Sequence, residues 1–444
     1  MSNRSTWQKV IERFDPEAPA QNPAWRASRS RSPAKAIGDW LDIPVGIPRV
    51  LLTGTVGTGK TTELYRIAES RAAKEFVVFV DLERHFTDVV GDAPALQQIA
   101  SWEVCFLMGV ALLRAAKERL GFEFPKQHQK DLEQAWSKLA TKSGTGDSDP
   151  KLDVMSLAKS MVVMASSAVP GAGAAVDAGL TLLKATTEAV KWSVRIGRTR
   201  NVLDDQEADV QTLLASVNTL IGLIQQRGTR VLFVIDGLDR IRELSRAREL
   251  FLDSQLISQM ACPMVVCGPF ALRHHPSTAA IRGFHDVAPL VNEPVLNKGQ
   301  PSQPGPGVAF LRELFEKRVS DLPNGTSLIS DVRLQQLAYY SGGRARELVT
   351  FVRRLAELCW LADVPQATDD LVARVLDERR RHRETGLHKG HIGVLESVAK
   401  DPDHRLPADP LAQELLNYGT LLPYPNESEW YYPHPLLLMH LLKV

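Results

Sequence analysis

The chain has few cysteines, almost no excess charge and no recognisable secretion signal. Its 4 cysteines are scattered and none forms a C-x-x-C pair. A disulfide framework is therefore excluded, and a reducing cytosol is the expected compartment. The net charge of +1 provides no overall field that would attract nucleic acid or an anionic membrane. The first five residues lack the apolar core of a signal peptide, which also favours a cytoplasmic location.

Long apolar runs are missing as well. No stretch reaches the roughly 18–20 apolar residues that a membrane span requires. The nearest candidate, 154–183, is rich in small and apolar residues but is interrupted by Lys159, Asp177 and the Pro170–Gly171 pair. We expect a buried or partner-facing pair of helices there. With 44% hydrophobic and 24% charged residues, the composition is that of a globular protein with about two to four domains.

A glycine-rich loop is the most informative feature that the chain does have. Residues 49–62 read R-V-L-L-T-G-T-V-G-T-G-K-T-T, which places G-x-x-x-x-G-K-T between an apolar run and a helical pattern, as a Walker A loop requires. The glycines let successive N–H groups face a polyphosphate. Lys60 is expected to reach the β and γ phosphates, and the Thr61 hydroxyl to bind Mg²⁺. The expected nucleotide-binding residues of this loop are Gly54, Thr55, Val56, Gly57, Thr58, Gly59, Lys60, Thr61 and Thr62.

A second apolar run, 231–235, ends in D-G-L-D-R at 236–240 and has the features of a Walker B strand. Asp236 is expected to hold Mg²⁺ opposite Thr61, and Asp239 to polarise the attacking water. Asp-Gly at a strand end also occurs in β-hairpins, but the Walker A loop favours the first interpretation. ATP and Mg²⁺ are therefore the expected cofactors. The residues assigned to catalysis are Asp239, Asp236 and Lys60.

Further apolar runs predict an α/β fold. The run at 76–81 is apolar up to its last residue, Asp81, and the run at 263–268 has no charged residue, as is typical of parallel strands covered on both faces. Strands that alternate with helices predict a doubly wound parallel sheet with the phosphates at its carboxyl edge. Lys60 and Asp236 lie 176 positions apart, which is more than two or three βαβ units need. We therefore expect a helical insertion at about 121–200.

The remainder of the chain indicates two smaller domains. The stretch 297–307 is so rich in proline and glycine that it is expected to form neither helix nor strand and to act as a linker. After it, apolar residues recur at a helical spacing. Beyond 387, two helical patterns, two aromatic strand patterns and an apolar helix indicate a winged-helix-like domain. The predicted division is an N-terminal arm at 1–35, a P-loop ATPase core at 36–296, a helical lid at 297–386 and the winged-helix-like domain at 387–444.

These motifs resemble the AAA+ and STAND branches of the P-loop ATPases, which include NACHT and Orc/Cdc6-like proteins. D-G-L-D resembles a STAND Walker B motif, although Arg240 stands where NACHT-type motifs continue with another acid, which indicates slow turnover. Related ATPases keep a polar sensor after the next strand, a place held here by Cys267 or Gly268. The resemblance further implies that Arg346, in the glycine-led helix start G-G-R-A-R, reaches the γ phosphate. His434 matches a winged-helix histidine that contacts nucleotide in STAND switches.

Other arginines match the resemblance more weakly. Arg318 resembles a recurring lid arginine. Arg282 and Arg273 are candidates for an arginine finger in an oligomer, although a plain surface arginine is the commoner case. The most basic stretch, E-R-R-R-H-R at 378–383, is more often a solvated helix face than a nucleic-acid contact.

The resemblance implies a Mg²⁺-dependent, ATP-binding and hydrolysing switch that controls self-assembly or a partner effector subunit. Bacterial STAND-like proteins often serve in antiviral defence. Two alternatives stay open. One is a DNA-binding Orc/Cdc6- or transposition-type AAA+ ATPase, which the low net charge and the acidic wing at 425–429 disfavour. The other is an ATP-holding scaffold with little turnover, which the cation after the Walker B motif favours.

Overall fold

The computed structural model describes residues 3–18, 20, 22–143, 153–167, 179–183, 196–197, 205, 207–274, 281–425 and 429–443. Parts of the insertion predicted at about 121–200 therefore lie outside the described residues, among them 144–152 and most of the stretch after 167. The chain forms two compact units. The sheet unit comprises 33–54 and 63–289, and the lid unit comprises 1–32, 55–62 and 290–444.

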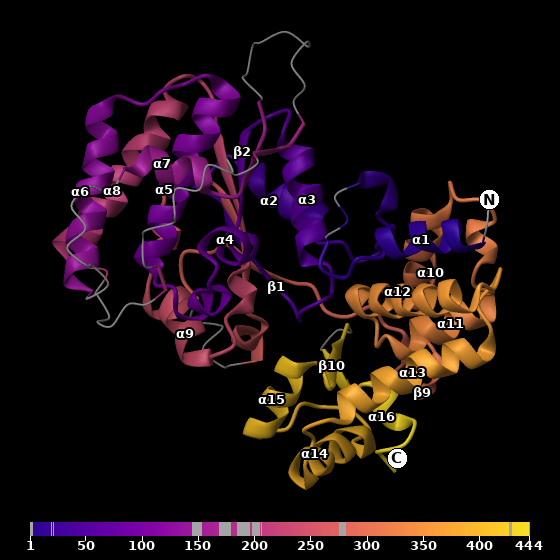
Figure 1. Ribbon diagram of the computed structural model, residues 1–444. Helices are drawn as coiled ribbons and strands as arrows, with labels where there is room; N and C mark the ends of the chain where they lie inside the picture. Colours follow the sequence, from indigo (N-terminus) through magenta and orange to yellow (C-terminus); the bar gives the residue numbers. More distant parts are fainter. Residues whose placement is uncertain are drawn as a thin grey trace. The chain divides into compact units, whose positions relative to one another are not determined.

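A seven-stranded sheet forms the centre of the sheet unit (Figure 1), in the order β4-β3-β2-β5-β6-β1-β7. From β2 to β7 in that order, neighbouring strands run parallel. The predicted α/β class with a mostly parallel sheet is therefore confirmed. The strands are β1 Arg49–Thr53, β2 Phe76–Asp81, β3 Val163–Ala165, β4 Thr181–Leu183, β5 Val231–Asp236, β6 Met264–Gly268 and β7 Asp286–Pro289.

Helices cover both faces of this sheet, with α5 and α8 on one face and α2 and α3 on the other (Figure 1). Strands covered on both sides must be apolar along their whole length, and every residue of β5 is indeed buried. The helices of the sheet unit are α2 Ala34–Leu41, α3 Lys60–Arg71, α4 Leu82–His85, α5 Ser101–Leu120, α6 Lys126–Lys142, α7 Val154–Ser160, α8 Ala208–Gln225 and α9 Leu244–Arg248, of which α3 begins with loop residues of the lid unit.

The insertion predicted to be helical at about 121–200 contains strands as well as helices. Helices α6 and α7 lie within it, but the pair of helices expected over 154–183 is wrong for the described residues. Instead, β3 pairs antiparallel with β2, and β4 pairs antiparallel with β3. The three residues of β3 are fully or almost fully buried, and they cover an edge of β2 that would otherwise expose unpaired backbone groups.

The lid unit contains the stretches predicted as the helical lid, the winged-helix-like domain and the N-terminal arm. The lid helices are α10 Val308–Val319, α11 Asp331–Tyr340, α12 Ala345–Ala362 and α13 Asp369–Glu384. The winged-helix-like part has α14 Lys389–Lys400, α15 Pro410–Tyr418, an antiparallel pair of strands, β10 Leu421–Tyr424 and β11 Trp430–Pro433, and the short α16 Pro435–Leu438. The elements predicted for this part of the chain are thus present.

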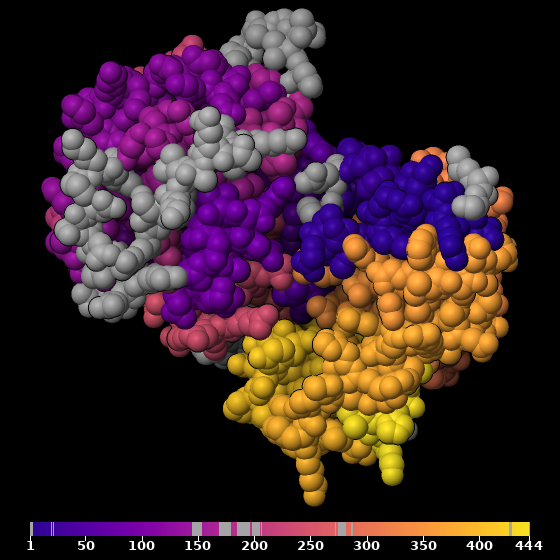
Figure 2. Space-filling view, viewed as in Figure 1, coloured from indigo at the N-terminus to yellow at the C-terminus, as the bar shows by residue number. Residues whose placement is uncertain are grey.

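The N-terminal arm packs on the lid, where indigo atoms lie against orange ones in Figure 2. Its helix α1, Asn3–Arg13, lies along α12. Trp7 is fully buried there, and its indole N–H donates to the Val364 carbonyl at 2.8 Å. Fully buried Phe14 lies with its ring centroid 5.8 Å from that of Phe315 on α10. The arm is therefore part of the hydrophobic core of the lid unit.

The linker predicted at 297–307 is instead largely a β-hairpin. Strands β8 Leu296–Asn297 and β9 Gln300–Pro304 pair antiparallel. The prediction was wrong because proline is excluded only from strands that need both sets of backbone hydrogen bonds. In a two-stranded hairpin each strand uses one edge, so Pro301 and Pro304 can be accommodated. Across the described residues, no helix is both long enough and apolar enough to cross a membrane.

Candidate nucleotide site

The glycine-rich loop follows β1 and ends where α3 begins at Lys60. Gly57 and Gly59 have φ angles of +90° and +99°, a region that side-chain-bearing residues rarely adopt. At Gly57 a Cβ atom would also lie only 3.2 Å from Cβ of Arg346. Both glycines therefore permit the curl of the loop, and Gly57 also permits the close approach of α12.

The backbone carbonyls of this loop accept hydrogen bonds from donors elsewhere in the lid unit. Arg344 donates from Nε to the Val56 oxygen at 3.0 Å and from Nη2 to the same oxygen. The backbone N–H of Arg346 donates to Gly57 O at 3.1 Å. Arg29 of the N-terminal arm donates to Thr58 O at 2.7 Å. Anchored carbonyls fix the peptide planes, and with them the N–H groups that would face a polyphosphate.

The carbonyl group of Thr55, near the start of the loop, is held by side chains of the loop itself. Lys60 is buried, and its Nζ donates to the Thr55 carbonyl at 2.8 Å. The Thr58 hydroxyl donates to the same carbonyl at 2.9 Å. The lysine expected to bind phosphate is thus folded back over the loop that would carry the phosphate.

Sequence reasoning selected Arg346 and passed over Arg344, two positions away. Only the backbone of Arg346 is seen bonding to the loop, so its predicted contact with the γ phosphate stays a prediction. The guanidinium of Arg344 does bond to the loop. It also lies close to Gly419, where an added Cβ atom would be 2.3 Å from Nη1 of Arg344. The signal was present in the G-G-R-A-R stretch, but the spacing could not tell which arginine faces the loop.

Arg344 belongs to a cluster of charged side chains next to the loop, formed with Glu347, Arg379 and Arg383. Glu347 is buried and pairs with Arg383 at 3.0 Å and Arg379 at 3.3 Å. Loss of hydration by itself would raise the pKa of Glu347, but the surrounding positive groups, Arg383 first, hold it well below its usual range. Loss of hydration lowers the pKa of Arg344 to about 10, and the nearby charge of Arg383 acts in the same direction.

His434 lies fully buried at the edge of this cluster. Its Nδ1 accepts from the backbone N–H of Leu436 at 3.3 Å, which caps α16. Burial, and next the charge of Arg383, lower its pKa well below the usual range, so the imidazole is neutral at physiological pH. The structure gives His434 a capping role, and its predicted contact with nucleotide stays a prediction.

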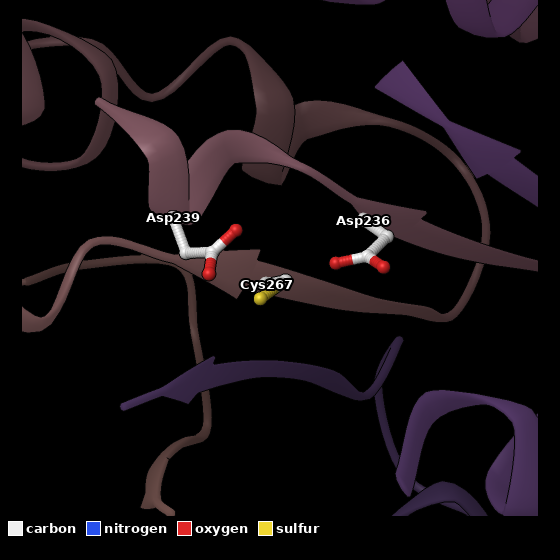
Figure 3. A group of neighbouring side chains, drawn as sticks. All are labelled: Asp236, Asp239 and Cys267. Carbon is white, nitrogen blue, oxygen red and sulfur yellow. The ribbon is translucent and has the colours of Figure 1, made fainter. Parts of the chain in front are cut away.

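The predicted Walker B residues meet at the carboxyl edge of the sheet (Figure 3). Asp236 ends β5, Asp239 lies in the following 3-10 helix, and Cys267 lies on β6. One potential ligand atom from each lies within 4.8 Å of the other two. The carboxylates of Asp236 and Asp239 suit Mg²⁺, which prefers oxygen ligands. Because β5 pairs in parallel with β2 and β6, the β-hairpin alternative for Asp-Gly is wrong.

The turn between the two acids depends on Gly237. Its φ is +99°, and a Cβ atom there would lie 2.6 Å from the backbone nitrogen of Glu83. The Gly237 N–H donates to Oδ1 of Asp236 at 2.9 Å. This tight turn directs the chain from Asp236 to Asp239 within one short segment.

Two further charged groups lie beside these acids. Asp81 ends β2 and is the register partner of Asp236. Loss of hydration, followed by the charge of Asp236, raises its pKa to about 7. Sequence reasoning missed Asp81, although an acid at the end of a neighbouring strand was a visible signal. Arg240, the departure from the NACHT pattern, pairs with Glu83 at 2.6 Å.

The weaker arginine candidates take other positions. Arg318 is buried, donates to the Arg13 carbonyl at 2.9 Å and has its guanidinium carbon 5.2 Å from the centre of the Phe14 ring. It therefore ties the arm to α10. Arg282 is exposed and Arg273 partly exposed, and whether either acts as an arginine finger stays a prediction.

The mostly parallel sheet, the glycine-rich loop after β1 and the two acids at and just after the end of β5 make up the α/β arrangement that the sequence motifs predicted. The chain matches no protein-family model and no curated protein.

Among solved structures, the chain is similar to Aeropyrum pernix ORC2 in its ADPNP-ADP complexes, with TM-score 0.41, 11% identity and coverage of 96% of this chain and 93% of that one. For Aeropyrum pernix ORC1 in complex with DNA, the TM-score is 0.40 and the identity 12%, and the match covers 97% of this chain and 93% of that one. For Drosophila ORC bound to DNA, the TM-score is 0.36 and the identity 13%, and the match covers 88% of this chain and 72% of that one. Each of these three proteins is less than 25% identical in sequence to this chain.

Proposed function

We propose that this chain is a Mg²⁺-dependent ATP-binding and hydrolysing switch of the AAA+/STAND kind, which controls self-assembly or a partner effector. The observation that carries the proposal is the anchoring of the phosphate loop by three other segments of the lid unit. These are the arm through Arg29, the start of α12 through Arg344 and Arg346, and the segment before β8 through Asn292. The side chain of Asn292 accepts a hydrogen bond from the Thr55 hydroxyl of the loop at 3.1 Å. A nucleotide that alters the loop must alter these anchors as well.

In this proposal Lys60 exchanges the Thr55 carbonyl for phosphate oxygens when ATP binds. Thr61 and Asp236 are the proposed ligands of Mg²⁺, which would neutralise phosphate charge. Asp239 orients the attacking water. A bacterial antiviral setting with a separate effector subunit is proposed from the resemblance to STAND proteins.

The DNA-binding alternative has less support from the described residues. In the basic stretch of α13, Arg379 and Arg383 pair with Glu347, and Arg380 and Arg381 pair with Asp377. These positive charges are thus partly neutralised within the lid unit. Strands β10 and β11 contain no Lys or Arg, so they offer little to a phosphate backbone.

ATP hydrolysis and molecular mass, measured with and without Mg²⁺ and DNA, test the proposal. Wild type is compared with Lys60→Ala and with Lys130→Ala, a control at an exposed lysine of α6. We expect Mg²⁺-dependent turnover and an ATP-dependent change in mass in wild type and the control, both lost in Lys60→Ala. Stimulation by DNA that weakens steeply with salt would favour the DNA-binding alternative. ATP binding without turnover or a change in mass would favour the scaffold.

A further inference from the structure

Asn292 links the phosphate loop to the winged-helix-like domain. It lies between β7 and α10 and is only 1% exposed. Its Oδ1 accepts from the Thr55 hydroxyl at 3.1 Å, and its Nδ2 donates to the Pro423 carbonyl of β10 at 3.1 Å. One side-chain amide therefore bonds both to the first variable position of the loop and to β10, which together with β11 is called the wing below.

The orientation of this amide follows from its partners. A carbonyl oxygen can only accept a hydrogen bond, so the NH₂ group of Asn292 must face Pro423. The amide oxygen then faces Thr55, whose hydroxyl can donate. Neither partner can be exchanged for the other by turning the amide over.

The wing also contacts the segment just before α12, at a second point close by. The hydroxyl of Tyr424, the residue after Pro423, donates to the Gly342 carbonyl at 3.0 Å. Gly343 in turn accepts from the backbone N–H of Glu293, next to Asn292, at 3.0 Å. The wing strand, the start of α12 and the segment 292–293 therefore form one hydrogen-bonded group around the loop.

We infer that Asn292 is a positioning residue that couples nucleotide binding in the loop to docking of the winged-helix-like domain. The inference rests on the proposed binding of ATP and adds the route by which it reaches the wing. If β10 separates from Asn292, the Nδ2 group of Asn292 loses its acceptor. If Thr55 moves, the Oδ1 atom of Asn292 loses its donor. A buried polar group without a partner is costly, so each event changes the free energy of the other. Coupling of this kind is reciprocal.

Hydrogen–deuterium exchange of the full chain, measured with and without a slowly hydrolysed ATP analogue, tests this coupling. In wild type, the analogue is expected to change exchange in β10 and β11. In Asn292→Leu the analogue should still bind, about three- to tenfold more weakly, as the loss of one hydrogen bond predicts. The nucleotide-dependent change in the wing strands should be lost.

Two further variants make the test specific. Thr55→Val keeps the side-chain shape and the backbone N–H but removes the hydroxyl, so it should abolish the same response from the side of the loop. The double variant should be no worse than either single variant, because both break one link. Thr420→Val is the control and should keep the response, since among the described residues its hydroxyl donates to Leu415 O, within the winged-helix-like domain.

An unchanged wing response in Asn292→Leu and Thr55→Val, or additive losses in the double variant, would overturn the inference. If wild type binds the analogue but its wing strands do not respond, the coupling is refuted while the proposed ATP binding stands. If wild type and Lys60→Ala bind equally poorly, the proposed function itself fails. Because Thr55→Val is nearly isosteric, it supplies the answer even if Asn292→Leu does not fold.

Discussion

Replacing Arg344 with methionine distinguishes two roles for the arginines at the start of α12. The side chain of Arg344 bonds to the carbonyl of Val56, whereas Arg346 bonds to the loop through its backbone. Arg344→Met keeps most of the length and the apolar part of the side chain but removes the donors. We expect weaker binding of ATP and ADP by similar factors, because the lost bond orients the loop and does not report on the γ phosphate.

The size of this effect follows from the contact. A hydrogen bond from a charged donor contributes about 1.5–3 kcal/mol. Arg344 is partly exposed, so a value near the lower end, about 2 kcal/mol, is reasonable. If nucleotide binding must then order the loop, this corresponds to about 30-fold in Kd. Arg344→Lys, which keeps the charge but loses the planar fork, should fall between wild type and Arg344→Met.

Competition titrations with ATP and ADP, alongside thermal unfolding of each variant, would measure these affinities. Arg346→Ala is the matched control, since it preserves the backbone N–H that bonds to Gly57. If Arg346 senses the γ phosphate as predicted, that variant should weaken ATP more than ADP. A folded Arg344→Met protein whose ATP and ADP affinities lie within twofold of wild type would refute the positioning role of Arg344.

Three other substitutions test separate parts of the structure. Glu347→Gln leaves the arginines around it without their anion and should lower the free energy of unfolding, measured in urea titrations, by about 3 kcal/mol. Because folding lowers the pKa of Glu347, this contribution to stability is present above the unfolded pKa of about 4.3 and fades as the pH falls below that value. Asp239→Asn should abolish turnover and preserve ATP binding, whereas an ATP-holding scaffold predicts unchanged behaviour. In Gly237→Ala the added Cβ atom would lie 2.6 Å from the backbone nitrogen of Glu83. This variant should lose more than about 1 kcal/mol of stability and turn over ATP more slowly, without binding ATP more weakly. Normal turnover and stability would contradict the proposed tight turn.

The sequence by itself determined the parts that depend on local pattern. The spacing of glycines before Lys60 predicted a strand, a curled loop and a helix, because few residues other than glycine adopt the required φ angles. Continuous apolar runs predicted β2, β5 and β6, since strands between two helical layers have no solvent-facing side. The winged-helix-like elements were likewise visible as short periodic segments.

Tertiary structure decided which distant groups meet. Thr55 and Asn292 are 237 positions apart and share a hydrogen bond, while strand register places Asp81 beside Asp236. The choice between Arg344 and Arg346, the packing of the arm on the lid and the strands within the expected helical insertion were settled in the same way. Local sequence sets backbone preferences, but contacts across such separations depend on how whole elements pack and which buried polar groups must find partners. No local pattern contains that information.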